Sequence, residues 1–191
     1  MAMLLSGIAI NALAGSIIGL FISISSDAQL RSFTFWTLGG LDSADWSIIY
    51  LSFFFIFIPF IMVYRMKNQM DVFMLGDAES QHLGLNIELL KKKIILISSI
   101  MVGISVSFTG MIGFIGLVTP HLVRLCIGPN HKYLIPGSAL LGAILLTLSD
   151  FICKTVISPA QLPVGVITSA IGAPFFVWLI IIQKRRFSYS E

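Results

Sequence analysis

The chain has 191 residues, of which 57% are hydrophobic and only 11% are charged, and its mean hydropathy is +0.96. Soluble domains carry roughly 25% charged residues, so this composition excludes a soluble globular protein and indicates an integral membrane protein. The net charge of +3 is no sign of nucleic-acid binding, because the basic residues stand at the ends of apolar segments rather than on one face. Two cysteines provide no disulfide framework.

The apolar segments predict an all-α fold, a polytopic membrane helix bundle forming a single transmembrane domain over residues 1–191. About 20 residues suffice to cross a bilayer, and about five segments come close to that length or exceed it: 1–24, 48–64, 94–112, 133–156 and 163–182. Residues 113–126 are too short and contain Pro120, so we expect one short half-helix, which is tolerated only inside protein or beside a cavity. No signal peptide is evident, and the chain begins inside an apolar segment, as we expect of a fragment.

The first apolar segment contains one strongly polar side chain, Asn11, among many small residues. Small residues such as Ser6 and Gly15 let helices approach closely. Asn11 could either form a buried hydrogen bond between helices or line a translocation pathway. On the second interpretation the candidate pathway residues are Asn11, Ser6 and Gly15.

Segment 25–46 is polar and aromatic and separates the first two spans. It contains Trp36 and Trp46, and tryptophan is enriched at membrane interfaces. We therefore expect a short helix that lies on one membrane surface and ends at Gly39 and Gly40.

The longest polar run, 66–93, lies between two spans. Within it, residues 74–84 predict a short helix, because Asp77 and Glu79 suit the positive end of a helix dipole and Gly84 is typical of a helix end. Three apolar residues could form one edge of this helix: Leu75, Ala78 and Leu83. A soluble partner could act on the membrane part through such a helix; the alternative is a surface loop that only connects two spans.

The basic residues predict the orientation of the chain. With 113–126 as a half-helix, most of them fall on one side of the membrane: Arg65, Lys67, Lys91 to Lys93, Arg124, Lys132 and Lys184 to Arg186. Only Arg31 and Lys154 fall on the other side. The positive-inside rule makes the crowded side cytoplasmic, so segment 66–93 is expected inside and segment 25–46 outside.

Several motifs, taken in order, resemble one family of membrane proteins. They are 35–39 (FWTLG), 75–79 (LGDAE), 113–124 (GFIGLVTPHLVR), 128–132 (GPNHK), 136–142 (PGSALLG), 162–165 (LPVG) and 172–176 (GAPFF). The set is similar to the FecCD-type permease family of ABC importers for iron-siderophores, haem and vitamin B12, and the resemblance extends over essentially the whole chain. Members have ten membrane helices, so the chain resembles the second half, and stretches 6–15 and 27–32 are most similar to the haem-importing branch.

The resemblance implies a mechanism and partners. A homodimer of permease copies would enclose a central pathway in the bacterial cytoplasmic (inner) membrane, in contact with membrane lipid. ABC ATPase subunits would bind inside, and an extracytoplasmic substrate-binding protein would deliver an iron chelate or haem, with vitamin B12 as the alternative substrate. The chain itself would be no enzyme and would bind no cofactor, because the ATPase would hold ATP and the sequence has no Gly-x-x-x-x-Gly-Lys-Ser/Thr loop.

The resemblance also implies site residues. The residues expected to couple the permease to the ATPase are Leu75, Gly76, Asp77, Ala78, Glu79, Leu83 and Gly84. Arg31 and Lys154 are expected to dock the binding protein, although Lys154 could instead pair with Asp150 one helical turn away. The chain departs from the family pattern at Asn130, Lys154 and Gln161, where Asp, Arg and Glu are usual, which weakens the expectation of charge pairing on the outer surface.

Other classes of site and function are also open. His82, His121 and His131 stand on different segments without the close spacing of zinc ligands, so we expect no metal site. A channel or secondary transporter would usually show ionisable groups near mid-membrane, where Asp150 is the one candidate. A non-transporting scaffold, or an inactive truncated permease, is the remaining alternative.

Overall fold

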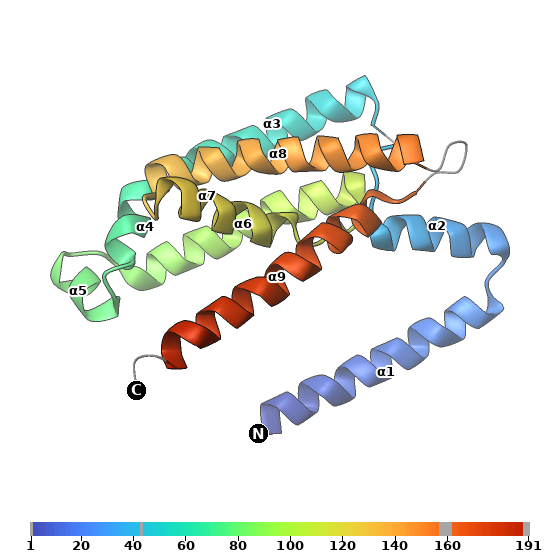
Figure 1. Ribbon diagram of the computed structural model, residues 1–191, viewed down its shortest axis with the longest axis horizontal. Coiled ribbons are helices and arrows are strands. Elements are labelled where there is room, and N and C mark those ends of the chain that lie inside the picture. Colours follow the sequence, from blue (N-terminus) through green and yellow to red (C-terminus); the bar gives the residue numbers. More distant parts are fainter. Residues whose placement is uncertain (1, 43, 157–161, 189–191) are drawn as a thin grey trace. The chain divides into compact units, whose positions relative to one another are not determined.

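The computed structural model describes residues 2–42, 44–156 and 162–188, and every regular element in these ranges is an α-helix (Figure 1). The all-α prediction is therefore confirmed. The chain divides into two compact units, Met1–Thr37 and Leu38–Glu191. Gln161, and all but the last two residues of a turn expected at 158–163, lie outside the described residues.

The first unit contains α1 (Ala2–Ile24) and nearly all of α2 (Asp27–Leu38). The Gln29 side-chain oxygen accepts hydrogen bonds from the Ser26 backbone N–H at 3.0 Å and from the Ser26 hydroxyl at 3.2 Å. These bonds correspond to one half of a capping box, in which the side chain three residues into the helix accepts from the capping residue, and they hold the chain at its entry into α2. The short helix expected in segment 25–46 is thus present, and it ends just before Gly39.

In the second unit, long helices pack in pairs. Helix α3 (Trp46–Arg65) lies along α6 (Ile87–Thr109), α7 (Ile115–Ile127) lies along α8 (His131–Val156), and α9 (Val164–Ser188) contacts both α7 and α8 (Figure 1). The buried apolar side chains lie mainly where these helices meet: Ile87, Leu90, Ile97, Val118, Val123, Leu134, Cys153 and Val164. No residue of α3 is buried, although the helix is rich in phenylalanine, which suits a helix surrounded by lipid.

Among the described residues, three helices are long and apolar enough to cross a membrane: Leu5–Ile24, Trp46–Arg65 and His131–Val156. The helix expected at 94–112 is the later part of α6, which ends at Thr109 and is not among these three helices. Helix α6 begins at Ile87 because Asn86 caps it by accepting the Leu89 N–H at 3.0 Å. The last expected span forms α9, whose apolar part is the shorter stretch Val164–Leu179.

The expected half-helix forms as α7, after a break in the chain at Gly110 to Phe114. Gly110 and Phe114 both have positive φ angles, 69° and 67°. Positive φ is an uncommon conformation for phenylalanine and requires support from surrounding packing. That support includes the Gly40 N–H, which donates to the Thr109 carbonyl at 2.8 Å, and Gly172, where an added Cβ would overlap the Phe114 side chain.

Hydroxyl side chains within the long helices bond to their own backbone. On α6, Ser105, Ser107 and Thr109 each donate to the carbonyl four residues earlier, at 2.8 to 3.0 Å. On α8, Thr147 and Ser149 do the same at 2.8 Å. These hydroxyls have hydrogen-bond acceptors within their own helices, so they do not by themselves indicate a polar neighbour or an aqueous pathway.

Candidate functional site

The polar run 66–93 folds into two short helices, α4 (Lys67–Phe73) and α5 (Asp77–His82), followed by the first turns of α6. Helix α5 is the helix expected within 74–84, and Gly76 and Gly84 stand at its two ends with φ angles of 108° and 78°. Both values favour glycine, which explains why α5 is bounded by these residues. Helix α4 was not expected, because its sequence, KNQMDVF, has no clear apolar periodicity.

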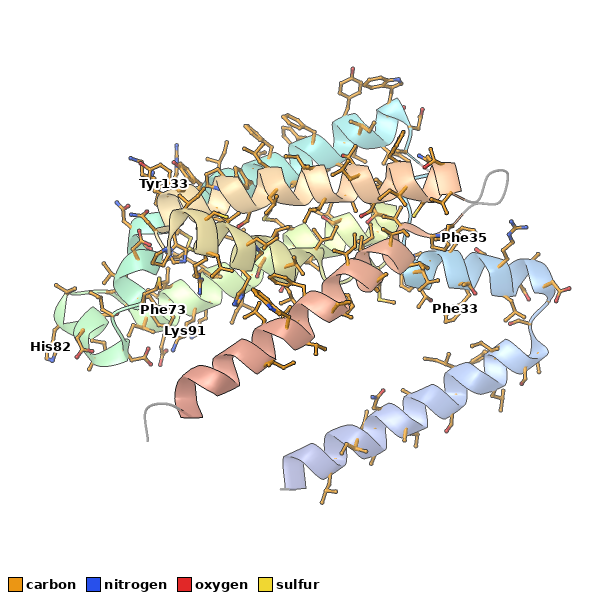
Figure 2. All side chains as sticks on the ribbon, viewed as in Figure 1. Phe33, Phe35, Phe73, His82, Lys91 and Tyr133 are labelled. Carbon is orange, nitrogen blue, oxygen red and sulfur yellow. The ribbon has the colours of Figure 1, made fainter. Side chains whose placement is uncertain are left out.

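The apolar edge expected on this helix is exposed. Leu75 is 60% exposed and Leu83 is 64% exposed, and Ala78 between them is also exposed. His82 projects from the end of α5 (Figure 2). Two leucines that no described part of the chain covers are consistent with a surface that a partner protein buries.

A buried hydroxyl holds α5 to the preceding helix. Ser80 is completely buried, and its Oγ lies 2.9 Å from the Val72 carbonyl oxygen and 2.6 Å from that of Gly76. The single hydroxyl proton can be donated to either carbonyl. Because Val72 belongs to α4, this contact joins the two short helices.

The lysines that follow α5 contribute a second connection. Lys91 Nζ lies 3.4 Å from Asp77 Oδ2 and 5.1 Å from the centre of the Phe73 ring (Figure 2). Both groups of the ion pair are about half exposed or more, so the pair adds little stability by itself. Its effect is geometric, because it connects the first turn of α5 to α6.

A hydrogen-bonded contact without a sequence signal joins α4 to the start of α8. The Asp71 Oδ1 accepts a hydrogen bond from the His131 backbone N–H at 2.9 Å and lies 2.6 Å from the His131 Nδ1. Burial by itself raises the pKa of Asp71, but the hydrogen bonds from His131 outweigh it, so the pKa is lowered from its ordinary value of 3.8. The signal available in the sequence was only an acidic residue and a histidine 60 positions apart, which no periodic pattern connects.

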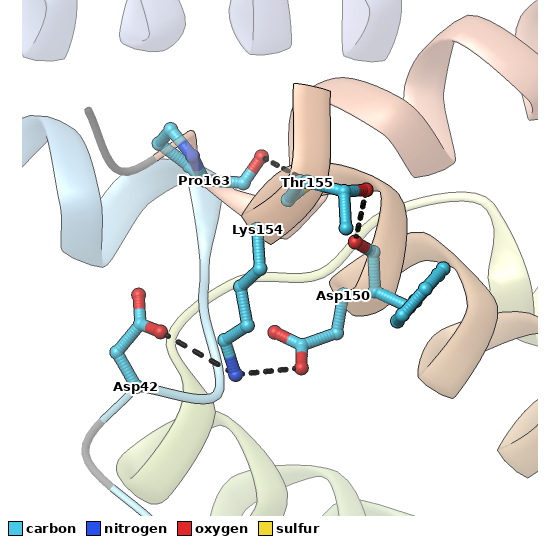
Figure 3. Close-up of polar contacts among 7 residues, drawn as sticks. Asp42, Asp150, Lys154, Thr155 and Pro163 are labelled. Atoms are coloured by element: carbon cyan, nitrogen blue, oxygen red, sulfur yellow. Dashed lines mark hydrogen bonds and ion pairs between the residues drawn. The ribbon is translucent and has the colours of Figure 1, made fainter. Parts of the chain in front are cut away.

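Lys154 lies at the other end of α8 between two carboxylates. Its Nζ is 2.7 Å from Asp150 Oδ2 and 3.7 Å from Asp42 Oδ1 (Figure 3). The pair with Asp150 was the alternative considered from the sequence, whereas the contact with Asp42 was not foreseen. The Lys154 side chain is still 54% exposed, so it remains accessible to a partner.

The other expected site residues lie in the first unit. Arg31 stacks over the Phe35 ring, with its Cζ 5.8 Å from the ring centre. All three candidate pathway residues are exposed on α1. Asn11 and Gly15 lie about one turn apart on the same side, whereas Ser6 and Gly15 are nine positions apart and face opposite sides of the helix. The three therefore do not share one face.

An apolar groove of about 840 Å³ lies between α3, α6 and α8. Its lining includes Phe53, Phe57 and Leu140 and contains no charged side chain. The hydroxyls of Ser52 and Thr109, which also line it, donate to carbonyls of their own helices.

The three histidines lie on separate helices, and Asn130 caps a helix. The three histidines lie on three helices, α5, α7 and α8, and His131 is held by Asp71. Asn130 immediately precedes α8, and its Oδ1 accepts the Lys132 N–H at 2.9 Å. Asn is as good a helix cap as Asp, so the departure from the family pattern at this position preserves the local structure.

The basic residues of the second unit are distributed unevenly along it. Arg65 ends α3, Lys67 begins α4, and Lys132 lies in the first turn of α8, which contacts α4. Lys154 lies at the opposite end of α8. The structure thus separates Lys154 from the other three residues along α8, and which end faces the cytoplasm stays a prediction of the positive-inside rule.

Comparison with known proteins gives a consistent result. The model of the FecCD transport family matches residues 1–182. The chain is 44% identical to the hemin transport system permease protein HmuU of Yersinia pestis, over 96% of this chain and 55% of that protein. It is 36% identical to the vitamin B12 import system permease protein BtuC of Salmonella arizonae, again over 96% of this chain and 55% of that protein.

A solved structure has the same fold over most of the chain. It is described as a metal-chelate type ABC transporter in an inward-facing conformation, and it matches with a TM-score of 0.81 and 29% identity, over 93% of this chain and 57% of that one. The chain thus spans about half the length of the proteins that it matches.

Proposed function

Because this chain belongs to the FecCD transport family, we propose that it serves as a permease subunit of an ATP-binding-cassette importer. The substrate is an iron chelate, either haem or a ferric siderophore, and the membrane is the bacterial cytoplasmic (inner) membrane. The observation that carries the proposal is the exposed apolar edge of α5, anchored to α4 and α6 at the basic end of the second unit. A short, anchored helix with uncovered leucines is suited to fit a cleft on a soluble subunit.

In this proposal the chain moves the substrate and its partners supply energy and delivery. An ABC ATPase subunit receives α5 and binds the ATP, so the permease is not itself an enzyme. A second permease copy completes the pathway, and an extracytoplasmic binding protein docks on the outer face near Lys154 and Arg31. ATP-driven closure of the ATPase pair displaces α5 and switches the pathway between its two openings.

Haem is the first candidate substrate, because the identity to the hemin permease, 44%, exceeds that to the vitamin B12 permease, 36%. Vitamin B12 is the second candidate, supported by the same family membership and by coverage of 96% of the chain.

The experiment is reconstitution of the transporter in proteoliposomes with its ATPase and its binding protein. We expect ATP-dependent uptake of haem, with a ferric siderophore and cobalamin as competitors. Uptake of cobalamin alone would select the second candidate, and uptake of none of the three would contradict the proposal. In the variant Gly76→Val/Glu79→Lys, the protein should reach the membrane and lose uptake; unchanged uptake would show that α5 is not the coupling helix.

A further inference from the structure

The first backbone N–H of α8 is bonded to another helix. A helix leaves its first N–H groups without acceptors of its own. Asn130 accepts from the following donors, those of Lys132, Tyr133 and Leu134, at 2.9, 3.2 and 3.0 Å. The remaining N–H, that of His131, donates to the Asp71 carboxylate on α4. The start of α8 is therefore capped partly by its own chain and partly by α4.

The Asp71–His131 contact between α4 and α8 has the features of a strong hydrogen bond. One carboxylate oxygen of Asp71 accepts from the His131 backbone and contacts its ring, at 2.9 and 2.6 Å. The two side chains are largely shielded from solvent, 32% exposed for Asp71 and 16% for His131. Hydrogen bonds to an ionised group are stronger than neutral ones, and a negative charge is favoured at a helix N-terminus.

The next residue along α4 is bonded to the coupling helix. Val72 follows Asp71, and its carbonyl lies 2.9 Å from the buried Ser80 hydroxyl of α5. Helix α4 has only seven residues, Lys67–Phe73. Within this short helix, Val72 thus contacts α5 and the preceding residue, Asp71, contacts α8.

We propose that Asp71 is a positioning residue that transmits displacement of α5 to the membrane helix α8. The inference rests on the proposed function, in which the ATPase moves α5. Displacement of α5 moves α4 through Ser80, and α4 moves the start of α8 through Asp71. Packed and hydrogen-bonded elements of this kind carry energetic coupling between sites. Residues 74–76 also join α5 to α4 directly, whereas the chain itself reaches α8 from α5 only through α6 and α7.

The test follows α8 directly in the reconstituted transporter, without needing a substrate. Tyr133→Cys, in a Cys126→Ser background, places a thiol at an exposed position in the first turn of α8. We expect ATP to change the rate of maleimide labelling several-fold, and Asp71→Ala to abolish that change. Asp71→Asn keeps an oxygen for the His131 N–H and should retain part of it.

The matched control is Glu88→Gln, which removes a carboxylate that is 86% exposed and pairs with Lys92 at 3.8 Å. It should leave the ATP-dependent labelling as in the wild type. In the same complexes, substrate moved per ATP hydrolysed should fall about tenfold or more in Asp71→Ala, because a hydrogen bond to a charged group is lost. His131→Ala, which keeps the backbone donor, should show a smaller fall and replaces Asp71→Ala if that variant fails to assemble.

Three results would overturn the inference: no ATP-dependent labelling with Asp71 present, the same dependence in Asp71→Ala as in the wild type, or an equal loss in Glu88→Gln. Loss of the dependence in Asp71→Ala but not in Glu88→Gln supports it. If labelling depends on ATP and on Asp71 but no candidate substrate is taken up, the proposed function fails and the role of Asp71 stands. If uptake is normal and labelling ignores Asp71, the reverse holds.

Discussion

The substitution Gly76→Ala tests the backbone conformation of the residue that precedes α5. The residue has φ 108° and ψ 162°, a region of backbone conformation essentially confined to glycine. An added Cβ would also lie 3.0 Å from Glu79 Oε2. That contact is with the flexible end of a side chain, which can move aside. The cost of the substitution therefore comes from the backbone.

The size of the effect follows from that conformation. Holding a residue with a Cβ in such a region costs on the order of 1–3 kcal/mol. If the cost falls on the local structure of α5, the equilibrium for its opening rises about 5- to 150-fold. The rest of the second unit should be unaffected, because the hydrogen bonds that Gly76 forms are all local: its N–H donates to the Phe73 carbonyl, and its carbonyl lies within hydrogen-bond distance of the Ser80 N–H and hydroxyl.

The measurement is hydrogen–deuterium exchange of peptides covering α5 in detergent or nanodiscs. Exchange of the Ser80 and Leu83 amides, which donate to the carbonyls of Gly76 and Glu79, should accelerate in Gly76→Ala. Gly103→Ala is the control: Gly103 lies inside α6 with no atom within 4 Å of an added Cβ, so α5 should exchange as in the wild type. Wild-type exchange of α5 in Gly76→Ala would refute the assigned conformation, and faster exchange throughout the unit would refute its local character.

Lys154→Glu should slow association of the binding protein with the complete transporter by no more than about fivefold, most at low salt, because an exposed ion pair contributes little; equal association rates at low ionic strength would assign Lys154 only to its two carboxylate contacts. Because the pKa of Asp71 is lowered, its contribution to stability is fully present above pH 3.8 and is lost as the pH falls through the lowered value. Protection of the amides at the α4–α8 contact from hydrogen exchange should therefore fall over the same pH range, and Asp71→Asn should remove this pH dependence. Gly165→Ala should lower the thermal unfolding temperature in detergent, because its Cβ would overlap the Leu38 carbonyl oxygen, and overpacking costs about 1–3 kcal/mol; Gly103→Ala should not lower it.

The parts of the fold that the sequence could predict are those with a local signal. Apolar length predicted α1, α3 and α8, and the shortness of 113–126 predicted the half-helix α7. Pro120, which was expected to interrupt a helix, lies inside α7, and the break falls before it at Gly110 to Phe114. The acidic first turn and Gly84 predicted α5. The early start of α6 also had a signal, Asn86 followed by an acidic first turn, but the lysines after it were interpreted as the membrane boundary.

The parts that the sequence could not predict depend on contacts between distant residues. Asp71 meets His131 across 60 positions, and Asp42 reaches Lys154 only because the linker before α3 folds back towards the end of α8. Helix α4 forms without an apolar periodicity of its own, in contact with α8. Such pairings depend on tertiary structure, whereas sequence patterns report mainly on short-range periodicity.

The hydroxyl groups of α6 have a consequence for biosynthesis. A polar group that enters hydrocarbon without a partner is costly, and serines in a membrane helix are often assumed to await a neighbouring helix. On α6, Ser98, Ser105 and Ser107 bond to the carbonyls of Ile94, Met101 and Gly103, all within the same helix. Their hydrogen bonds are complete as soon as the helix has formed. As α6 forms during biosynthesis, these three hydroxyls therefore need no partner from α3 to complete their hydrogen bonds.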